Sequence, residues 1–217
     1  MIEAVVFDMD GVIVDSEPVW QRVRVDLMDE HGAEWTGADG DGCRGVASAV
    51  WSSRMAARLD AAMSAEDVFS NVLERMVVAY AHRLPLFPGA VEAIERIATR
   101  YTVAVASGSP RELVDFVLDG SGLTRLCAAV AYGDEVRRGK PAPDIYIDVL
   151  EKIHVAPSHA VGVEDSESGL RSLHAAGMQS IAVVAPDYAL PPDILALTAA
   201  TIDGLGDLTL SVIDAID

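Results

Sequence analysis

Two acidic residues with clear chemical potential follow the first apolar run of the chain. Asp8 and Asp10 are two positions apart, so in an extended segment both carboxylates point to the same side, and Gly11 then permits a sharp turn. Facing carboxylates repel one another unless a cation lies among them. An all-oxygen cluster suits a hard ion such as Mg²⁺, which in turn attracts phosphate oxygens. A lone pair of this kind is usually a solvated turn, so its interpretation depends on its neighbours.

A hydroxyl-rich turn follows the second apolar run. In Ser107-Gly108-Ser109, hydroxyls and backbone N–H groups stand at the start of a predicted helix, where the helix dipole favours an anion. Ser107 and Gly108 are therefore candidates for phosphate binding. Ser109 is followed by Pro110 and, three residues on, by Glu112, which also matches an N-cap with a capping box. Both roles stay open for Ser109 on the sequence alone.

A lysine and a second acidic pair follow the later runs. Lys140 is one of only two lysines among 217 residues, and its ammonium could neutralise both a carboxylate and phosphoryl oxygens. Glu164 and Asp165 come directly after the fourth run and could complete the ligand shell of a metal ion. The structural alternatives are a solvated loop lysine and acidic residues placed before a helix N-terminus. Together the four groups favour one joint site.

These groups can meet only if the fold brings four separate segments together. Five short apolar runs are typical of strands buried in a parallel sheet, namely 2–7, 101–106, 126–131, 160–163 and 180–184. Helical patterns between them cover 89–100, 110–119, 143–154 and 167–176, the last closed by Gly177. This alternation predicts an α/β fold with a doubly wound, mostly parallel, Rossmann-like sheet. Ligands of such sheets bind beyond the carboxyl ends of the strands.

Residues 17–84 interrupt this alternation. They contain three helical patterns, at 18–31, 46–59 and 65–83. Ser64 and Asp67 match a capping box at the start of the last one. We therefore expect a small all-helical cap domain inserted at 17–84 into an α/β catalytic core made of residues 1–16 and 85–217.

The composition limits the class of partner. A formal net charge of −18 disfavours nucleic acids and anionic membranes, whose binding rests on clustered Lys and Arg. The chain has no run of about 18 apolar residues and no basic leader before the first strand. Its two cysteines form no CxxC pattern, which is typical of a reducing compartment. We expect a cytoplasmic monomer that binds a small phosphorylated substrate, with Mg²⁺ and Lys140 reversing the local field.

Four motifs carry a resemblance to a known family. FDMDGVIVDSEP (7–18), VASGSPREL (105–113), GKPAPDIY (139–146) and GVEDSESGL (162–170) stand in the order and spacing expected of it. They resemble the haloacid dehalogenase-like (HAD) phosphohydrolases, in particular the β-phosphoglucomutase-like branch with a small helical cap. The resemblance covers essentially the whole chain. It implies a Mg²⁺-dependent phosphatase that hydrolyses a small phosphorylated metabolite such as a sugar phosphate.

The resemblance also assigns roles to individual residues. It implies that Asp8 is the nucleophile that forms an aspartyl phosphate, and that Asp10 is the general acid and then the general base. The implied metal ligands are Asp8, the backbone carbonyl of Asp10, Asp165 and, through water, Glu164. The implied phosphate-binding groups are Ser107, the Gly108 amide and Lys140.

This sequence departs from the motifs of several related enzymes, and these departures narrow the range of reactions that it could catalyse. A dehalogenase does not need a second aspartate, so Asp10 favours phosphoryl transfer, and the absence of lysine from residues 16–86 disfavours a phosphonatase. A β-phosphoglucomutase-type isomerase remains the alternative. Against it, Trp20 stands where that enzyme has a hinge histidine, while Arg44 and Ser48 alter its second phosphate site. Hydrolysis is therefore the preferred interpretation.

Candidate substrate-specificity residues lie in the cap and at the rim of the expected site. They are Trp20, Arg44, Ser109 and Arg111. For Trp20 the structural alternative is a core position in a helix. A distant functional alternative is a phospho-accepting signalling module of the response-regulator type, which also gathers acidic residues, a hydroxyl and a lysine at strand ends. Such a module is much shorter and needs no cap.

Overall fold

Six parallel strands form the centre of the structure, a computed structural model that describes residues 1–43, 46, 48–60, 62–184 and 189–216. The strands are β1 (Ala4–Phe7), β2 (Thr102–Ser107), β3 (Cys127–Tyr132), β4 (Ala160–Glu164), β5 (Gln179–Val183) and β6 (Ala200–Ile202). Their order is β3-β2-β1-β4-β5-β6, and every neighbouring pair is parallel. The order reverses direction at β1, which confirms the predicted doubly wound sheet.

The register of the central strands brings the expected site residues to one edge. Phe7, the last residue of β1, pairs with Val105 of β2 and with Val163 of β4. Asp8 therefore leaves the sheet beside Glu164, and its backbone N–H donates to the carbonyl of Val163 at 3.0 Å. Because all strands run the same way, the residues that follow β2, β1 and β4 lie at one edge of the sheet, around the topological switch point between β1 and β4.

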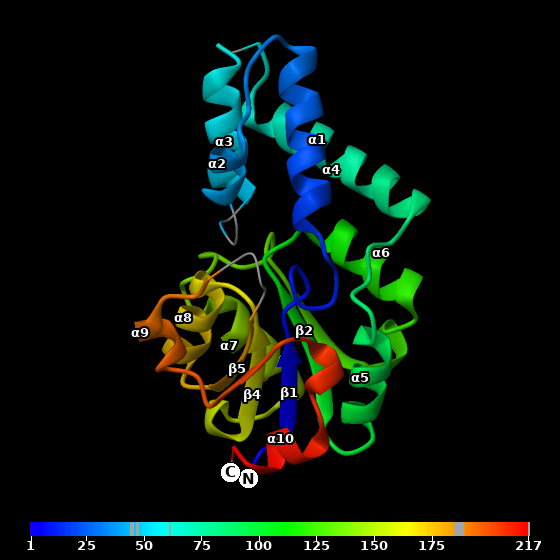
Figure 1. Cartoon of the computed structure of the whole chain (residues 1–217), viewed down its shortest axis with the longest axis vertical. Helices are drawn as coiled ribbons and strands as arrows, with labels where there is room; N and C mark the ends of the chain where they lie inside the picture. Colours follow the sequence, from blue (N-terminus) through cyan, green and yellow to red (C-terminus); the bar gives the residue numbers. More distant parts are fainter. Residues whose placement is uncertain (44–45, 47, 61, 185–188, 217) are drawn as a thin grey trace.

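Helices cover both faces of the sheet (Figure 1). They are α5 (Ala90–Ala98), α6 (Arg111–Ser121), α7 (Asp144–Ile153), α8 (Glu167–Ala176), α9 (Pro192–Leu195) and α10 (Leu210–Asp214). Alternate residues of β1 enter two different apolar clusters, since Val5 and Phe7 pack on the side of α5 and α6 while Ala4 and Val6 pack on the side of α7 and α8. A strand apolar on both faces is thus buried on both, as its sequence predicts.

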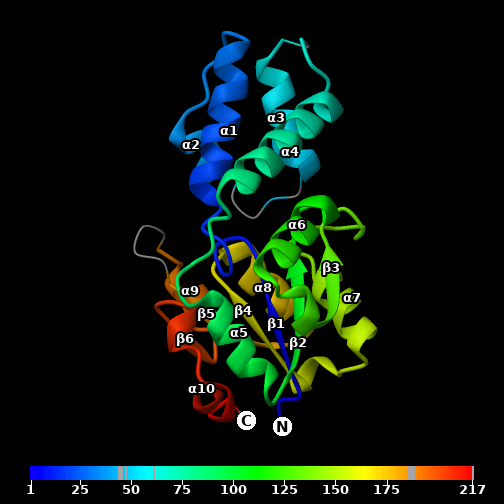
Figure 2. The same cartoon turned by 90° about the vertical axis from the view of Figure 1, so that its right-hand side faces the viewer.

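Four further helices lie beyond the carboxyl ends of the strands, at the top of Figures 1 and 2, and are here called the helical layer. They are α1 (Glu17–Glu30), α2 (Gly37–Asp41), α3 (Ser48–Arg58) and α4 (Ala65–His82). The capping box of Ser64 and Asp67 is confirmed at the start of α4. Helix α2 was not expected, because its sequence GADGD has no apolar period and depends on a capping box of Thr36 and Asp39.

The two chain crossings between the layers are paired with each other. The backbone N–H of Asp15 donates to the carbonyl of Pro85 at 2.8 Å, and that of Phe87 donates to Ile13 at 3.0 Å. This short antiparallel contact joins the start and the end of the helical segment at one place. The sheet and the helical layer are therefore connected by a double crossing beside β1, close to Asp8 and Asp10.

Some local predictions need correction. Strand β6 was missed because it is only three residues long, and α9 and α10 were missed because they are short. The capping box expected from Ser109 and Glu112 is wrong, since α6 begins at Arg111 with Pro110 as its N-cap. Gly177 does close α8 in a left-handed conformation, as predicted. Among the described helices, none combines the length and the apolar character needed to span a bilayer.

Candidate active site

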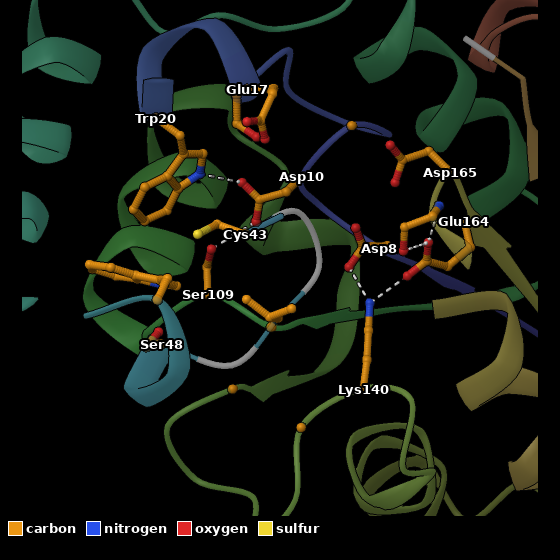
Figure 3. A pocket seen from close by; sticks show the side chains of 18 of the residues that line it. Asp8, Asp10, Glu17, Trp20, Cys43, Ser48, Ser109, Lys140, Glu164 and Asp165 are labelled. Atoms are coloured by element: carbon orange, nitrogen blue, oxygen red, sulfur yellow. Dashed lines mark hydrogen bonds and ion pairs between the residues drawn. The ribbon is translucent and has the colours of Figure 1, made fainter. Parts of the chain in front are cut away.

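A cavity of about 510 Å³ lies between the sheet edge and the helical layer. Its floor includes side chains that follow β1 and β4, together with Lys140 from the long loop after β3 (Figure 3). Its roof includes Trp20, Arg24 and Trp51 from α1 and α3. The volume lies in the range of small-molecule sites, and polar groups converge on one end of it. The sheet edge and the helical layer thus form the cavity jointly.

Three carboxylates on the floor form a compact buried cluster. Asp8, Glu164 and Asp165 each place an oxygen within 4.8 Å of the others, and all three residues are buried. Gly11 leaves room for this cluster, because a Cβ at Gly11 would lie 2.1 Å from an Asp165 oxygen, and its φ of +82° also disfavours any other residue. A buried all-oxygen set of this kind fits a hard divalent cation.

The ammonium of Lys140 connects the nucleophile candidate to Glu164. Its Nζ donates to Asp8 Oδ1 at 2.6 Å and to Glu164 Oε1 at 2.6 Å, and the lysine side chain is 5% exposed. Burial alone would lower the pKa of Lys140, but the carboxylates of Asp8 and Glu164 outweigh it and hold the pKa well above its usual value. Lys140 is therefore positively charged at neutral pH. This burial and pairing rule out the structural alternative, a solvated loop lysine.

The pKa of the Asp8 carboxyl group is raised by some of its surroundings and lowered by others. Burial raises its pKa well above the ordinary value, Lys140 opposes that rise, and the nearby carboxylates of Glu164, Asp10 and Asp165 add to it. A cation among these carboxylates would remove much of the repulsion. The donor set and its electrostatics therefore both fit a bound divalent metal.

Both oxygens of Glu164 already accept hydrogen bonds from the protein. Oε1 accepts from Lys140 and from the hydroxyl of Tyr146 at 3.2 Å. Oε2 accepts from the backbone N–H of Ser166 at 2.8 Å and from its hydroxyl at 3.0 Å. A Cβ at Gly169 would lie 1.6 Å from Oε1, so only glycine leaves space for this carboxylate. Tyr146, Ser166 and Gly169 were not singled out on the sequence, although they belong to its third and fourth motifs.

Asp10 lies in a separate hydrogen-bonded setting. Its Oδ2 accepts from the hydroxyls of Ser109 at 2.8 Å and Ser107 at 3.2 Å, and its Oδ1 accepts from the indole N–H of Trp20 at 3.3 Å. Ser107 also accepts the backbone N–H of Ser109 at 3.1 Å. Gly108 and Ser109 line the cavity, whereas the Ser107 hydroxyl is fully buried against Asp10. Ser109 therefore orients Asp10 instead of capping α6.

The specificity candidates have different positions. Trp20 lines the cavity and contacts Asp10, as Figure 3 shows. Arg44 lies outside the described residues. Arg111 is not among the described residues that line the cavity, because its guanidinium donates to Glu135 at 2.9 Å and stacks 3.9 Å from the ring centroid of Tyr132. The structure thus brings Trp20 and Ser109 to the cavity, and not Arg111.

A charged residue in the roof of the cavity, Arg24, was also missed on the sequence. Arg24 is 4% exposed, and its guanidinium lies 4.9 Å from the ring centroid of Trp20 and 5.2 Å from that of Trp51. A signal was present, because Arg24 occupies the apolar stripe of α1 formed by Trp20, Val23 and Leu27. A charged residue inside such a stripe indicates either a buried ion pair or a ligand contact.

Comparison with known proteins agrees with this geometry. A family model described as haloacid dehalogenase-like hydrolase matches residues 2–177. Hexitol phosphatase B of Escherichia coli K12 is 31% identical over 214 residues, covering 96% of this chain and 95% of the relative. The phosphorylated carbohydrates phosphatase of Thermotoga maritima is 31% identical over 181 residues, covering 83% and 84%. The crystal structure of CbbY from Rhodobacter sphaeroides in complex with phosphate is 26% identical, with a TM-score of 0.85 and coverage of 99% and 100%.

Three observations lead to the same family assignment. They are the sheet order, the carboxylate cluster with its buried lysine, and the match to the family model. The relatives named above that match by sequence at 31% identity are both phosphatases. The chain is therefore an enzyme, and it belongs to the haloacid dehalogenase-like hydrolase family.

Proposed function

We propose that the protein is a Mg²⁺-dependent phosphatase that hydrolyses a small phosphorylated metabolite of the sugar phosphate class through an aspartyl phosphate. The observation that carries the proposal is the buried group of Asp8, Lys140 and Glu164 at the carboxyl end of β1, with Asp10 held apart by its own hydrogen bonds. Two carboxylates in two environments suit two roles, one as nucleophile and one as acid and base.

In the first step, the Asp8 carboxylate attacks phosphorus, the bond between phosphorus and the ester oxygen breaks, and Asp10 gives a proton to the leaving oxygen. In the second step, Asp10 removes a proton from a water molecule that attacks the phosphorus of the aspartyl phosphate, which releases inorganic phosphate and restores Asp8. The hydrogen bonds from Ser109 and Trp20 orient the Asp10 carboxyl group for both transfers.

Charge neutralisation is the main electrostatic requirement of this reaction. Lys140 supplies one positive charge next to Asp8. Asp8, Asp165 and the backbone carbonyl of Asp10 would hold the metal ion, with Glu164 acting through water because its oxygens are engaged by Lys140, Tyr146 and Ser166. Bound Mg²⁺ would neutralise carboxylate and phosphoryl charge. Gly108 lines the cavity, and its backbone amide would bind phosphoryl oxygen.

The helical layer is proposed to act as a cap, with boundaries at 17–84. Trp20 and Trp51 contribute large apolar surfaces to the roof of the cavity, which would exclude bulk water from the phosphoryl group. The names of the two curated relatives, a hexitol phosphatase and a phosphorylated carbohydrates phosphatase, support a phosphorylated sugar or polyol as substrate. Monomeric state and cytoplasmic location stay predictions, and the free thiols of Cys43 and Cys127 suit a reducing compartment.

The test compares Asp8→Asn with a matched control in hydrolysis of p-nitrophenyl phosphate. Asp8→Asn is expected to abolish release of p-nitrophenol and chelation by EDTA to do the same reversibly, with activity restored by added Mg²⁺. Asp193→Asn, which removes an exposed carboxylate (side chain 69% exposed), is expected to retain activity. Hydrolysis by Asp8→Asn or in EDTA would overturn the proposal. Glucose 6-phosphate formed from β-glucose 1-phosphate faster than inorganic phosphate would instead identify an isomerase.

A further inference from the structure

Arg24 is a buried cation in the roof of the cavity, and part of its hydrogen-bonding capacity is unused. Its Nε and Nη1 have no hydrogen-bond partner among the described residues, although the residue is only 4% exposed. The guanidinium lies against the rings of Trp20 and Trp51, and those two rings are 5.8 Å apart between centroids. Arg24 also lines the cavity. The side chain is therefore held in place by aromatic contacts while part of its polar edge has no protein acceptor.

Such an arrangement is costly in the absence of a ligand. A guanidinium remains protonated in proteins, and a buried charged group without hydrogen bonds loses its hydration without replacement. Burial lowers the pKa of Arg24, whereas Cys43, Glu17 and Asp10 raise it from nearby. These groups attract the cation but do not accept hydrogen bonds from Nε or Nη1. The aromatic contacts provide some compensation, and the unsatisfied N–H groups remain.

The position of Arg24 connects it to the reaction. Trp20 contacts the guanidinium with its ring and donates its indole N–H to Asp10 at 3.3 Å. The guanidinium therefore lies over the ring of one indole and the acid–base candidate accepts from the N–H of the same indole, inside one cavity (Figure 3 shows the Trp20 and Asp10 side of this contact). A cavity of about 510 Å³ holds more than a phosphoryl group, so the remainder of a substrate reaches toward the roof.

We propose that Arg24 forms a second anion subsite, so that the preferred substrate carries a carboxylate or a second phosphate in addition to the phosphoryl group that is hydrolysed. This inference rests on the proposed phosphatase function and specifies its substrate class. A guanidinium matches the planar, two-oxygen acceptor edge of a carboxylate or phosphate. Neutral hydroxyl groups would accept hydrogen bonds from the N–H groups but bring no negative charge into contact with the guanidinium. An anionic group supplies both the acceptor oxygens and a negative charge in direct contact.

The experiment uses pairs of compounds that differ by one anionic group. Glucitol 6-phosphate is compared with gluconate 6-phosphate, and fructose 6-phosphate with fructose 1,6-bisphosphate, so that the carboxylate and the second phosphate are tested separately. Each is measured by kcat/KM or, for a compound that is not turned over, by its inhibition constant against p-nitrophenyl phosphate hydrolysis. The wild type is expected to favour the doubly anionic member of at least one pair by about 10- to 100-fold. The pair that shows this preference tells whether Arg24 binds a carboxylate or a second phosphate.

The variants separate recognition from folding. Arg24→Gln is expected to lose that preference, measured as the ratio of kcat/KM values or inhibition constants within each pair, and Arg24→Lys is expected to recover part of it. Arg22→Gln removes the same charge from the exposed side of α1 and is expected to keep the preference, which makes it the matched control. Thermal melting verifies that each variant is folded.

Three results would overturn the subsite. The first is that the wild type shows equal kcat/KM values or inhibition constants for both members of each pair. The second is that Arg24→Gln loses activity equally toward all compounds, and the third is that Arg22→Gln loses the preference as Arg24→Gln does. Absence of p-nitrophenyl phosphate hydrolysis in wild type would count against the phosphatase function itself, so the two failures are distinguishable.

Discussion

The floor and the roof of the cavity satisfy their polar groups to different degrees. On the floor, Lys140 and Glu164 share a network with Asp8, and both Glu164 oxygens accept hydrogen bonds. In the roof, two nitrogens of Arg24 and the Oε1 of Gln21 are buried without a partner among the described residues. A fixed charge network reduces reorganisation during chemistry, whereas unused donors acquire partners only when a ligand binds. We therefore assign the chemical step to the floor and substrate recognition to the roof.

The comparison also has a thermodynamic side. A paired buried charge is costly to disturb, while an unpaired one is costly to keep. Substitutions on the floor should therefore reduce activity for every substrate. A substitution of Arg24 should alter substrate preference and can increase stability. The following variants test this contrast, from the largest expected effect to the smallest.

Asp10→Asn should have the largest effect on turnover among these variants. Loss of the acid and base is expected to lower kcat about 10²- to 10⁴-fold for an alkyl phosphate. The first step should suffer less with p-nitrophenyl phosphate, whose leaving group needs no proton, so a burst of p-nitrophenol close to one equivalent of enzyme is expected in rapid-mixing measurements. Asp29→Asn, an exposed carboxylate of α1, serves as the control. An unchanged steady-state rate for alkyl phosphates would contradict the assigned role.

Lys140→Met should lower kcat/KM about 10²- to 10³-fold for all phosphate esters, because a preorganised charge beside the nucleophile is lost. The chain provides a close control in Lys152, the only other lysine, which lies on α7 and pairs with Asp148 at 2.7 Å. Lys152→Met is expected to keep activity within about twofold. Equal losses in the two variants would show that Lys140 has no special role in the reaction.

Glu164→Gln should have an intermediate effect, about 10- to 100-fold on kcat/KM, because Glu164 positions Lys140. A pH profile distinguishes this from general damage. One of the carboxylates that raise the pKa of Lys140 is removed, so that pKa falls and the alkaline limb of the profile should move to lower pH. An alkaline limb at the wild-type position would leave Glu164 with a purely structural role.

Arg24→Met should have the smallest effect on generic catalysis and the opposite sign for stability. Replacing an unpaired buried cation with an apolar side chain of similar length is expected to raise Tm, by about 2–4 °C for each kcal/mol gained. Differential scanning calorimetry without ligand measures this shift. A marked decrease in Tm would show that Arg24 is satisfied within the protein, which would remove the contrast between floor and roof.

Much of the fold was accessible from local sequence patterns. The five longer strands and the helices between them follow from apolar runs and from end signals such as Gly177. The short β6 and the glycine-rich α2 have too few residues for a periodic pattern, so their formation depends on neighbours such as β5. Ser109 shows the same limit, since its sequence fits an N-cap but its hydroxyl donates to Asp10.

The sequence by itself determined which groups stand after each strand, because parallel strands deliver Asp8, Lys140, Glu164 and Asp165 to one edge whatever the details of packing. Only the tertiary structure decided how these groups are used. Contacts between residues far apart in the chain place Lys140 between two carboxylates, turn Arg111 toward Glu135 and bury Arg24 against two tryptophans. Such contacts depend on three-dimensional packing between separate elements, for which local periodicity holds no information.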